Sequence, residues 1–282
     1  MTIFPNAKIN IGLTITGKRD DGYHNIESLF YPVGVRDILE FVPKSSGDST
    51  DELTNTGIKT NCSKSDNLVI KVLHLLRKEF SIPPLKIHLH KAIPHGAGLG
   101  GGSSDTAFMI RYLNRYFNLG LGTGRMTRLA LELGSDCSFF IRNTPSIVSG
   151  RGEIISETNF RLDGKYLLLV YPGISISTAE AYKMVKAGDR KQNIKEIITE
   201  PLVSWRHLIK NDFQDIIISR MPVIGQIIDH IYNSGALYCS MSGSGSAVYG
   251  IFDNMPDIIF TDQEYWTWKG KFQYIKLQGQ SQ

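Results

Sequence analysis

A glycine-rich segment at residues 94–105 constrains this chain more than any other feature, and it reads Pro-His-Gly-Ala-Gly-Leu-Gly-Gly-Gly-Ser-Ser-Asp. Five of the seven residues from Gly96 to Gly102 are glycine. Glycine loses more backbone entropy on folding than other residues, so this density indicates positive φ angles or close backbone contacts. A strand pattern precedes the segment at residues 85–90, and a helical pattern follows it. Such a turn is typical of phosphate binding, because its N–H groups and the helix N-terminus both attract anions.

The helix after the glycines is predicted to begin with Ser103 or Ser104 as its N-cap and to extend to about Phe117. A flexible connector is the alternative interpretation of the segment, but the flanking strand and helix favour phosphate binding. The glycines also satisfy the G-x-G-x-x-G pattern of dinucleotide-binding folds. Such folds need an acidic residue about 20 positions later, where residues 119–124 read Leu-Gly-Leu-Gly-Thr-Gly. The sequence therefore lends weak support to a Rossmann oxidoreductase.

The composition is that of a globular protein with one large domain or two smaller ones, since the chain has 282 residues. A net charge of +4 is too small to indicate nucleic-acid binding, and it suits an anionic small-molecule substrate. The three cysteines are far apart and form neither a zinc motif nor a disulfide framework. No apolar run reaches the roughly 20 residues of a membrane span, and residues 1–8 lack a signal-peptide pattern. We therefore expect a cytoplasmic protein without membrane or nucleic-acid partners.

The order of predicted elements indicates an α+β fold, because strands and helices do not alternate regularly. Residues 44–65 are polar and predict a surface excursion with little core. Predicted helices cover residues 67–80 after a cap at Ser65 or Asp66, residues 103–117 and 127–133, and several stretches between 178 and 233. Predicted strands cover residues 3–16, 26–42, 85–90, 138–141, 146–149, 153–156, 165–171, 237–241 and 247–252.

Further motifs accompany the glycine-rich segment in a fixed order along most of the chain. They are Pro5-Asn6-Ala7-Lys8-Ile9-Asn10-Ile11, residues 17–24, Gly134-Ser135-Asp136 and residues 242–246. With them, the pattern Pro94-x-x-x-Gly98-Leu99-Gly100-Gly101-Gly102-Ser103-Ser104 resembles the galactokinase, homoserine kinase, mevalonate kinase and phosphomevalonate kinase (GHMP kinase) superfamily. The run Asp21-Gly22-Tyr23-His24 is more specific, and it is similar to members that act on a cytidine diphosphate substrate.

The resemblance implies a two-domain α+β GHMP kinase fold, with domains over residues 1–155 and 156–282 and the active site in the cleft between them. It implies ATP as phosphoryl donor, used with Mg²⁺. The implied acceptor is the 2-hydroxyl of 4-diphosphocytidyl-2-C-methyl-D-erythritol, in the non-mevalonate route to isoprenoid precursors. The implied ATP-binding residues are Pro94, His95, Gly96, Ala97, Gly98, Leu99, Gly100, Gly101, Gly102, Ser103 and Ser104.

Lys8 and Asp136 are the catalytic residues that the resemblance implies. Lys8 and Asn10 are two positions apart in a predicted strand, so their side chains share one face. From the residues alone, Lys8 fits an exposed lysine and Asp136 fits a turn residue. By the resemblance, Asp136 accepts the proton of the attacking hydroxyl, and Lys8 orients Asp136 and stabilises charge near the phosphoryl group. Cys137-Ser138 stand where the family more often has Val-Pro. This departure affects the expected shape of the backbone after Asp136 and leaves its carboxylate in place.

The substrate-binding residues that the resemblance implies are Asn10, Tyr23, His24, Thr178 and Tyr182. Tyr23 and Tyr182 would sandwich the cytosine, and His24 would hydrogen-bond to its edge. From the sequence alone, Tyr23 and His24 fit an ordinary core tyrosine and surface histidine after a turn as well as they fit two ligand-binding residues. The sequence indicates neither the metal ligands nor the oligomeric state.

Two alternative functions remain within the same fold. One is another small-molecule GHMP kinase, of the mevalonate or homoserine type, and the Asp-Gly-Tyr-His run at residues 21–24 argues against it. The other is a ligand sensor without catalysis, and the presence of both Lys8 and Asp136 argues against that.

Overall fold

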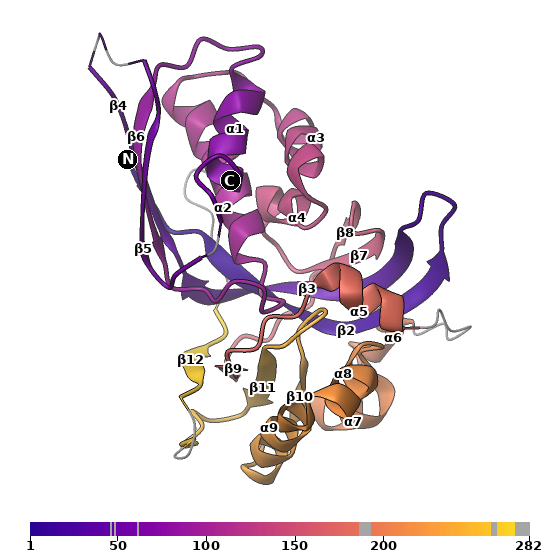
Figure 1. The fold of residues 1–282 in the computed structure, drawn as a ribbon. Helices are drawn as coiled ribbons and strands as arrows, with labels where there is room; N and C mark the ends of the chain where they lie inside the picture. Colours follow the sequence, from indigo (N-terminus) through magenta and orange to yellow (C-terminus); the bar gives the residue numbers. More distant parts are fainter. Residues whose placement is uncertain (46, 48, 61, 186–192, 261–263, 274–282) are drawn as a thin grey trace. The chain divides into compact units, whose positions relative to one another are not determined.

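A computed structural model describes residues 1–45, 47, 49–60, 62–185, 193–260 and 264–273 of the chain. These residues form two compact units (Figure 1). Unit 1 contains Met1–Ala7, Val35–Pro94 and Gly100–Asn143, and unit 2 contains the described residues of Lys8–Gly34, His95–Leu99 and Thr144–Gln282.

The two units interleave along the chain because strands that are distant in sequence pair with each other. β3 (His24–Arg36) pairs antiparallel with β7 (Ser146–Gly150), and both paired segments belong to unit 2. The predicted domains, residues 1–155 and 156–282, divide the chain differently and stay a prediction. None of the helices within the described residues has the length and apolarity that crossing a lipid bilayer requires.

Unit 1 is a sheet with helices on one side, as Figure 1 shows. Within the described residues its strand order is β1-β4-β6-β5, and only the β5–β6 pair is parallel. The strands are β1 (Thr2–Ile3), β4 (Ile38–Pro43), β5 (Glu52–Gly57) and β6 (Leu85–Lys91). The helices are α1 (Leu68–Leu76), α2 (Gly101–Tyr116), α3 (Thr123–Leu133) and α4 (Cys137–Arg142).

Unit 2 has two sheets in the described residues, with strand orders β2-β3-β7-β8 and β10-β11-β9-β12. The strands besides β3 and β7 are β2 (Asn6–Lys18), β8 (Ile154–Glu157), β9 (Tyr166–Tyr171), β10 (Tyr238–Met241), β11 (Val248–Phe252) and β12 (Trp266–Lys271). The helices are α5 (Thr178–Met184), α6 (Ile194–Ile197), the 3₁₀ turn η1 (Leu202–Ser204), α7 (Trp205–Leu208), α8 (Gln214–Arg220) and α9 (Pro222–Asn233).

One prediction of element type is wrong. Residues 138–141, predicted as a strand, lie in α4, because a short buried apolar run fits a helix as well as a strand. Residues 44–65 contribute little to the core, as predicted, since none of those described is buried, but they include β5, the parallel partner of β6. The sequence also failed to indicate β12, whose charged and glycine residues weaken the strand pattern.

Two predicted boundaries are also wrong. Asn67 caps α1, because its side-chain oxygen accepts a backbone N–H at 3.0 Å, whereas Ser65 or Asp66 was predicted as the cap. The predicted strand over residues 26–42 is interrupted at Asp37, whose carboxylate accepts two backbone N–H groups from residues 92 and 93. The α+β class itself is confirmed.

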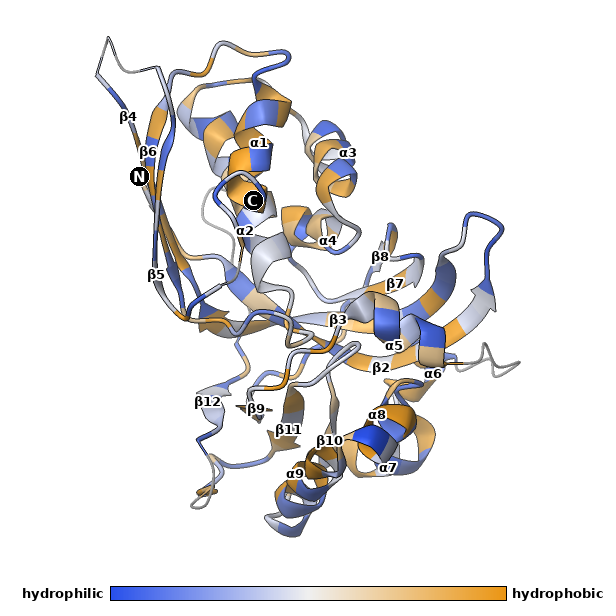
Figure 2. Ribbon diagram, in the orientation of Figure 1, coloured by the Kyte–Doolittle hydropathy of each residue, from blue (hydrophilic) through white to orange (hydrophobic). Residues whose placement is uncertain are grey.

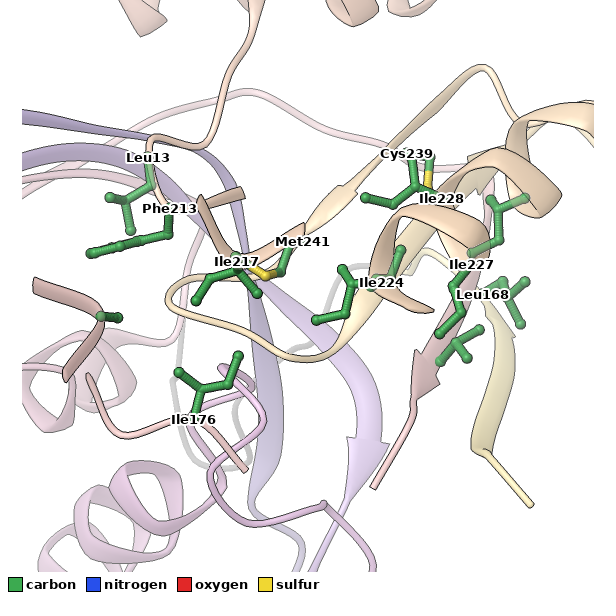
Figure 3. Packing of buried hydrophobic residues seen from close by; sticks show 14 of the residues in the cluster. Leu13, Leu168, Ile176, Phe213, Ile217, Ile224, Ile227, Ile228, Cys239 and Met241 are labelled. Atoms are coloured by element: carbon green, nitrogen blue, oxygen red, sulfur yellow. The ribbon is translucent and has the colours of Figure 1, made fainter. Parts of the chain in front are cut away.

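The core of unit 2 is a hydrophobic cluster beneath α9. Ile224, Ile227, Ile228 and Ile231 recur at helical spacing and are all buried, so one face of α9 is apolar. Figure 3 shows several of these side chains close to residues of the β9–β11 sheet, including Leu168 and those of β10. In Figure 2, β11 has the colour of hydrophobic residues, which fits a strand buried along its whole length.

Replacing Ile231 by alanine tests this core, because the side chain is 0% exposed. We expect a loss of about 2–5 kcal/mol in the free energy of unfolding, from lost burial and the cavity left behind. Urea unfolding followed by circular dichroism measures it. The control is Ile259→Ala, at a side chain that is 71% exposed, which should change stability by less than about 0.5 kcal/mol. Equal effects of the two variants would contradict the assigned packing.

Candidate functional site

The glycine-rich segment takes the backbone angles that its composition predicts. Gly96, Gly98 and Gly100 have φ values of +65°, +79° and +71°, a region that other residues rarely adopt. A Cβ on Gly98 would lie 2.0 Å from the carbonyl oxygen of Ser242. Glycine is therefore required at position 98 both by its φ angle and by the close approach of another backbone.

Backbone and hydroxyl hydrogen bonds hold residues 95–99 within unit 2. The N–H of Lys8 donates to the carbonyl of Leu99 at 3.0 Å, and the N–H of Ala247 donates to the carbonyl of Ala97 at 3.1 Å. The hydroxyl of Ser242 donates to the carbonyl of Gly98 at 2.9 Å. The turn at residues 242–246, between β10 and β11, therefore packs against the glycine-rich segment.

The lysine side chain at position 8 is buried and hydrogen-bonded. Lys8 Nζ donates to Asn10 Oδ1 and, at 3.2 Å, to the carbonyl of Gly98, and it lies 4.6 Å from the centroid of the Phe30 ring. The side chain is only 3% exposed. The predicted shared face of Lys8 and Asn10 is confirmed, and an exposed lysine is excluded. A buried charge requires such hydrogen bonds, since desolvation alone would be costly.

Asn10 connects Lys8 to two other strands of unit 2. Its backbone N–H donates to the hydroxyl of Ser242 at 3.1 Å, and its side-chain NH₂ donates to the hydroxyl of Ser28 at 3.1 Å. The side-chain oxygen accepts from Lys8. Asn10 therefore fixes the orientation of the lysine, and its predicted contact with substrate stays a prediction.

Tyr23 follows a hydrogen-bonded turn and is 54% exposed. Asp21 accepts the backbone N–H of Tyr23 at 3.1 Å and pairs with Arg19 at 3.0 Å. Hydrogen bonding to Arg19 holds the pKa of Asp21 below its ordinary value. The guanidinium of Arg151 lies over the Tyr23 ring, 5.1 Å from its centroid. The hydrogen bond to Asp21 therefore fixes the backbone of Tyr23, and the guanidinium of Arg151 contacts the exposed ring.

His24 and Tyr182 stack on each other in unit 2, with ring centroids 4.9 Å apart and planes 15° apart. Phe213 meets Tyr182 edge-on, with centroids 5.0 Å apart. On α5, one turn earlier, the hydroxyl of Thr178 lies 3.2 Å from that of Ser244. The structure thus brings His24 and Tyr182 together, and the sandwich of Tyr23 and Tyr182 around a base stays a prediction.

The predicted ATP-binding residues Gly100, Gly101, Gly102, Ser103 and Ser104 lie in unit 1, at the N-terminus of α2. This helix begins at Gly101 after the left-handed Gly100, so the predicted caps Ser103 and Ser104 are wrong. Glycine at the N-cap allows a turn that leaves both serines inside the first helical turn. Ser104 is fully buried, and its hydroxyl has no hydrogen-bond partner among the described residues.

Asp136 lies directly before α4 in unit 1 and is half-buried. Its neighbour Cys137 is buried, and burial raises the pKa of that thiol to about 11. The hydroxyl of Ser138 donates to the carbonyl of Ser135 at 2.9 Å, which stabilises the turn. Cys137 and Ser138 therefore form the first turn of a helix at the position where the sequence departs from the usual family pattern.

A buried cluster of three ionisable side chains in unit 1 was not predicted from the sequence. Lys91 Nζ pairs with Asp37 and, at 2.6 Å, with Asp105. All three side chains are buried. Lys91 has the same strand parity as the buried Leu85 and Leu89, so the alternation of β6 carried a signal for its burial. The described residues contain no group of three or more His, Cys, Asp or Glu side chains suited to a metal ion.

Comparisons with known proteins identify the family. The model for the N-terminal domain of GHMP kinases matches residues 67–144, and the model for the C-terminal domain matches residues 192–259. The chain belongs to the GHMP kinases. The two-domain family fold that the sequence indicated is thereby confirmed.

Curated relatives of this GHMP kinase are named 4-diphosphocytidyl-2-C-methyl-D-erythritol kinase. The relative from Bacteroides thetaiotaomicron is 47% identical over 253 residues, 90% of this chain and 92% of its own length. The relative from Parabacteroides distasonis is 48% identical, also over 90% of this chain and 92% of its own length. A crystal structure of 4-(cytidine 5'-diphospho)-2C-methyl-D-erythritol kinase matches with a TM-score of 0.74 at 26% identity, covering 89% of this chain and 90% of that one. Homoserine kinase from Cytophaga hutchinsonii is 16% identical and shares the fold with a TM-score of 0.63, covering 87% of this chain and 84% of that one.

Asp105→Asn should change how stability depends on pH. Burial raises the pKa of Asp105 from its ordinary 3.8 to about 7, so between these values the folded chain holds a proton that the unfolded chain releases. The free energy of unfolding of the parent chain therefore falls, relative to that of the variant, as pH rises from about 4 to 7, by up to about 1.4 kcal/mol per unit. Burial lowers the pKa of Lys91, but attraction to its two carboxylate partners outweighs this effect. The net pKa of Lys91 is raised above its ordinary value, so Lys91 titrates above this window.

Urea unfolding of the parent and of Asp105→Asn at pH 5, 6 and 7 measures the difference. A constant difference in the free energy of unfolding across these pH values would contradict the raised pKa. Asp163→Asn, at an exposed position on the surface, is the control for replacing a carboxyl group by an amide.

Proposed function

We propose that this GHMP kinase transfers the γ-phosphoryl group of ATP to the 2-hydroxyl of 4-diphosphocytidyl-2-C-methyl-D-erythritol, in the non-mevalonate route to isoprenoid precursors. The observation that carries the proposal is 47% identity to a relative of that name over 90% of the chain. Solved mevalonate and homoserine kinases are 13–16% identical to this chain, and they support the shared fold alone. A cytoplasmic location and the absence of nucleic-acid and membrane partners stay predictions.

The glycine-rich segment is the proposed site for the ATP phosphates. The positive φ angles of its glycines and the start of α2 at Gly101 support this assignment, because N–H groups at a helix N-terminus attract anions. Gly102 has open space around it, since the atom nearest to the position of an added Cβ is Leu68 Cδ1, 4.0 Å away. A phosphate oxygen can therefore approach the helix backbone at position 102. Mg²⁺, when bound with ATP, would neutralise part of the phosphate charge.

Lys8 and Asp136 are the proposed catalytic residues. Asn10 and the carbonyl of Gly98 hold the Lys8 ammonium in one orientation, which suits a charge that stabilises a transferring phosphoryl group. Asp136 is proposed to accept the proton of the attacking hydroxyl. In a loose transition state this proton leaves late, so the orientation of Asp136 matters more than its basicity.

Tyr23, His24 and Tyr182 are proposed to bind the cytosine. The stacked pair of His24 and Tyr182 supports this, because one face of Tyr182 already accepts an aromatic ring. A cytosine between Tyr23 and Tyr182 would take the place of the imidazole on Tyr182. His24 would then turn toward the edge of the base, where its ring nitrogens can hydrogen-bond. Thr178 and Asn10 are proposed to contact the rest of this substrate.

Incubation with ATP, Mg²⁺ and the cytidine diphosphate substrate tests the activity, with mass spectrometry of the product. We expect one added phosphoryl group on this substrate and none on mevalonate or homoserine. Lys8→Ala and Asp136→Asn should each lower kcat by about 10²–10⁴-fold while nucleotide binding persists. A folded parent chain that phosphorylates mevalonate or homoserine instead would overturn the proposed substrate. Near-normal kcat in either variant would overturn its catalytic role.

Gly102→Ala tests the phosphate site without disturbing the fold. The added methyl group has space within the protein, but it would occupy the position of an approaching phosphate, so we expect the KM for ATP to rise roughly tenfold, about 1.4 kcal/mol. Gly124→Ala, in α3, is the matched control, because a Cβ there meets nothing within 4 Å. Alanine favours a helix over glycine at both positions, so neither variant should lower the melting temperature. An unchanged KM for ATP in Gly102→Ala would place the phosphates elsewhere.

A further inference from the structure

The cluster of Asp37, Lys91 and Asp105 joins three segments of unit 1. Asp37 lies between β3 and β4, Lys91 ends β6, and Asp105 lies in the second turn of α2. Lys91 Nζ donates to one oxygen of each carboxylate. The other oxygen of Asp37 accepts the backbone N–H groups of Ala92 and Ile93, at 2.7 and 2.9 Å. The cluster thus fixes the backbone that leads into the glycine-rich segment as well as the helix that follows it.

The lysine ammonium lies directly behind the first residue of α2. A Cβ on Gly101 would be 3.4 Å from Lys91 Nζ and 3.0 Å from Ile93 Cγ2. Glycine at position 101 therefore lets the helix start pack against the ammonium. The N–H groups proposed to bind phosphate belong to this same first turn, so the ammonium of Lys91 and its two carboxylate partners lie on their inner side.

Packing alone does not require charged residues at these positions. A buried ion cluster is often no more stabilising than apolar side chains of similar volume, because desolvation offsets the attraction between the charges. A buried cation acts on a nearby anion with little screening, however, and it needs no reorganisation when the anion arrives. Because the two carboxylates cancel most of the charge of Lys91, the cluster suits a role in fixing the backbone on both sides of the glycine-rich segment and in limiting the negative charge behind it.

We propose that Lys91, held by Asp37 and Asp105, is a positioning residue of the nucleotide site, which fixes the start of α2 and whose ammonium offsets the buried carboxylate charge behind the phosphate-binding N–H groups. This inference rests on the proposed function. It assigns Lys91, Asp37 and Asp105 a role in ATP affinity that is separate from the acceptor site and from the phosphoryl-transfer step.

The charge state of the cluster follows from its composition. With both carboxylates ionised, two negative charges surround one positive charge. A proton on Asp105 makes the cluster neutral, and the pKa of about 7 for this carboxyl fits such a proton near neutral pH. The charged groups facing Asp105 are Lys91 and Asp37. The nearby thiol of Cys137, which contacts Ser103, stays neutral with a pKa of about 11. ATP affinity should therefore fall as Asp105 ionises above pH 7.

Calorimetric titration with ATP tests the proposal at pH 6, 7 and 8, on the full chain and on Asp105→Asn. We expect the parent chain to lose roughly three- to tenfold more affinity than the variant between pH 6 and 8. The nucleotide's own titration is common to both proteins, so the comparison isolates Asp105. In a second test, Lys91→Met should raise the KM for ATP roughly ten- to a hundredfold while the KM for the acceptor changes less than about twofold.

Arg77→Met is the matched control for loss of an ion pair in unit 1. Arg77 pairs with Asp51 and with the carbonyls of Ile82 and Pro83, none of which belongs to the glycine-rich segment. This variant should lower the melting temperature and leave the KM for ATP unchanged.

Identical pH profiles for the parent chain and Asp105→Asn would overturn the electrostatic role. A folded Lys91→Met with normal KM for ATP would overturn the positioning role, and the pH profile of Asp105→Asn decides the matter if Lys91→Met does not fold. Failure of the parent chain to bind ATP at any pH would overturn the proposed function itself, which is a different result from either of these.

Discussion

The geometry of the glycine-rich segment depends on how closely backbones approach it in unit 2. Residues 97–99 form hydrogen bonds with Lys8 and with the turn at residues 242–247, and a Cβ on Gly98 would overlap a carbonyl of that turn. The carbonyl of Gly98 also accepts from Lys8 Nζ. The same contacts therefore locate the segment and orient the proposed catalytic lysine. A side chain at position 98 would disturb both at once.

Two buried lysines have different surroundings in this protein. The partners of Lys8 include an amide oxygen and a backbone carbonyl, and those of Lys91 are two carboxylates. Carboxylates offset most of the charge and hold it firmly, which suits a structural position. The two carboxylate partners of Lys91 therefore fit its proposed positioning role, which burial alone would not indicate.

Local sequence patterns predicted much of the fold, and long-range contacts account for most errors. The alternation in β6 and the apolar spacing in α1 were sufficient to locate these elements. The apolar run in α4 was too short to distinguish helix from strand, and β5 depends on pairing with β6 rather than on its own polar sequence. At the site, the face shared by Lys8 and Asn10 followed from strand geometry. The stacking of His24 on Tyr182 joins residues 158 positions apart, so no local pattern could indicate it.

The hydrophobic cluster of unit 2 joins the first strands of the chain to its last helices and strands, and this has a consequence for how the chain acquires its structure during synthesis. Leu13, Ile15 and Ile26, near the N-terminus, pack in one cluster with residues of α9 and β10. These N-terminal strands emerge from the ribosome long before the segments that cover their apolar side chains. Contacts of such sequence separation form late because closing a long loop costs entropy before any contact compensates for it. Unit 2 can therefore complete its core only after nearly the whole chain has been made, and until then its first strands expose a surface prone to association.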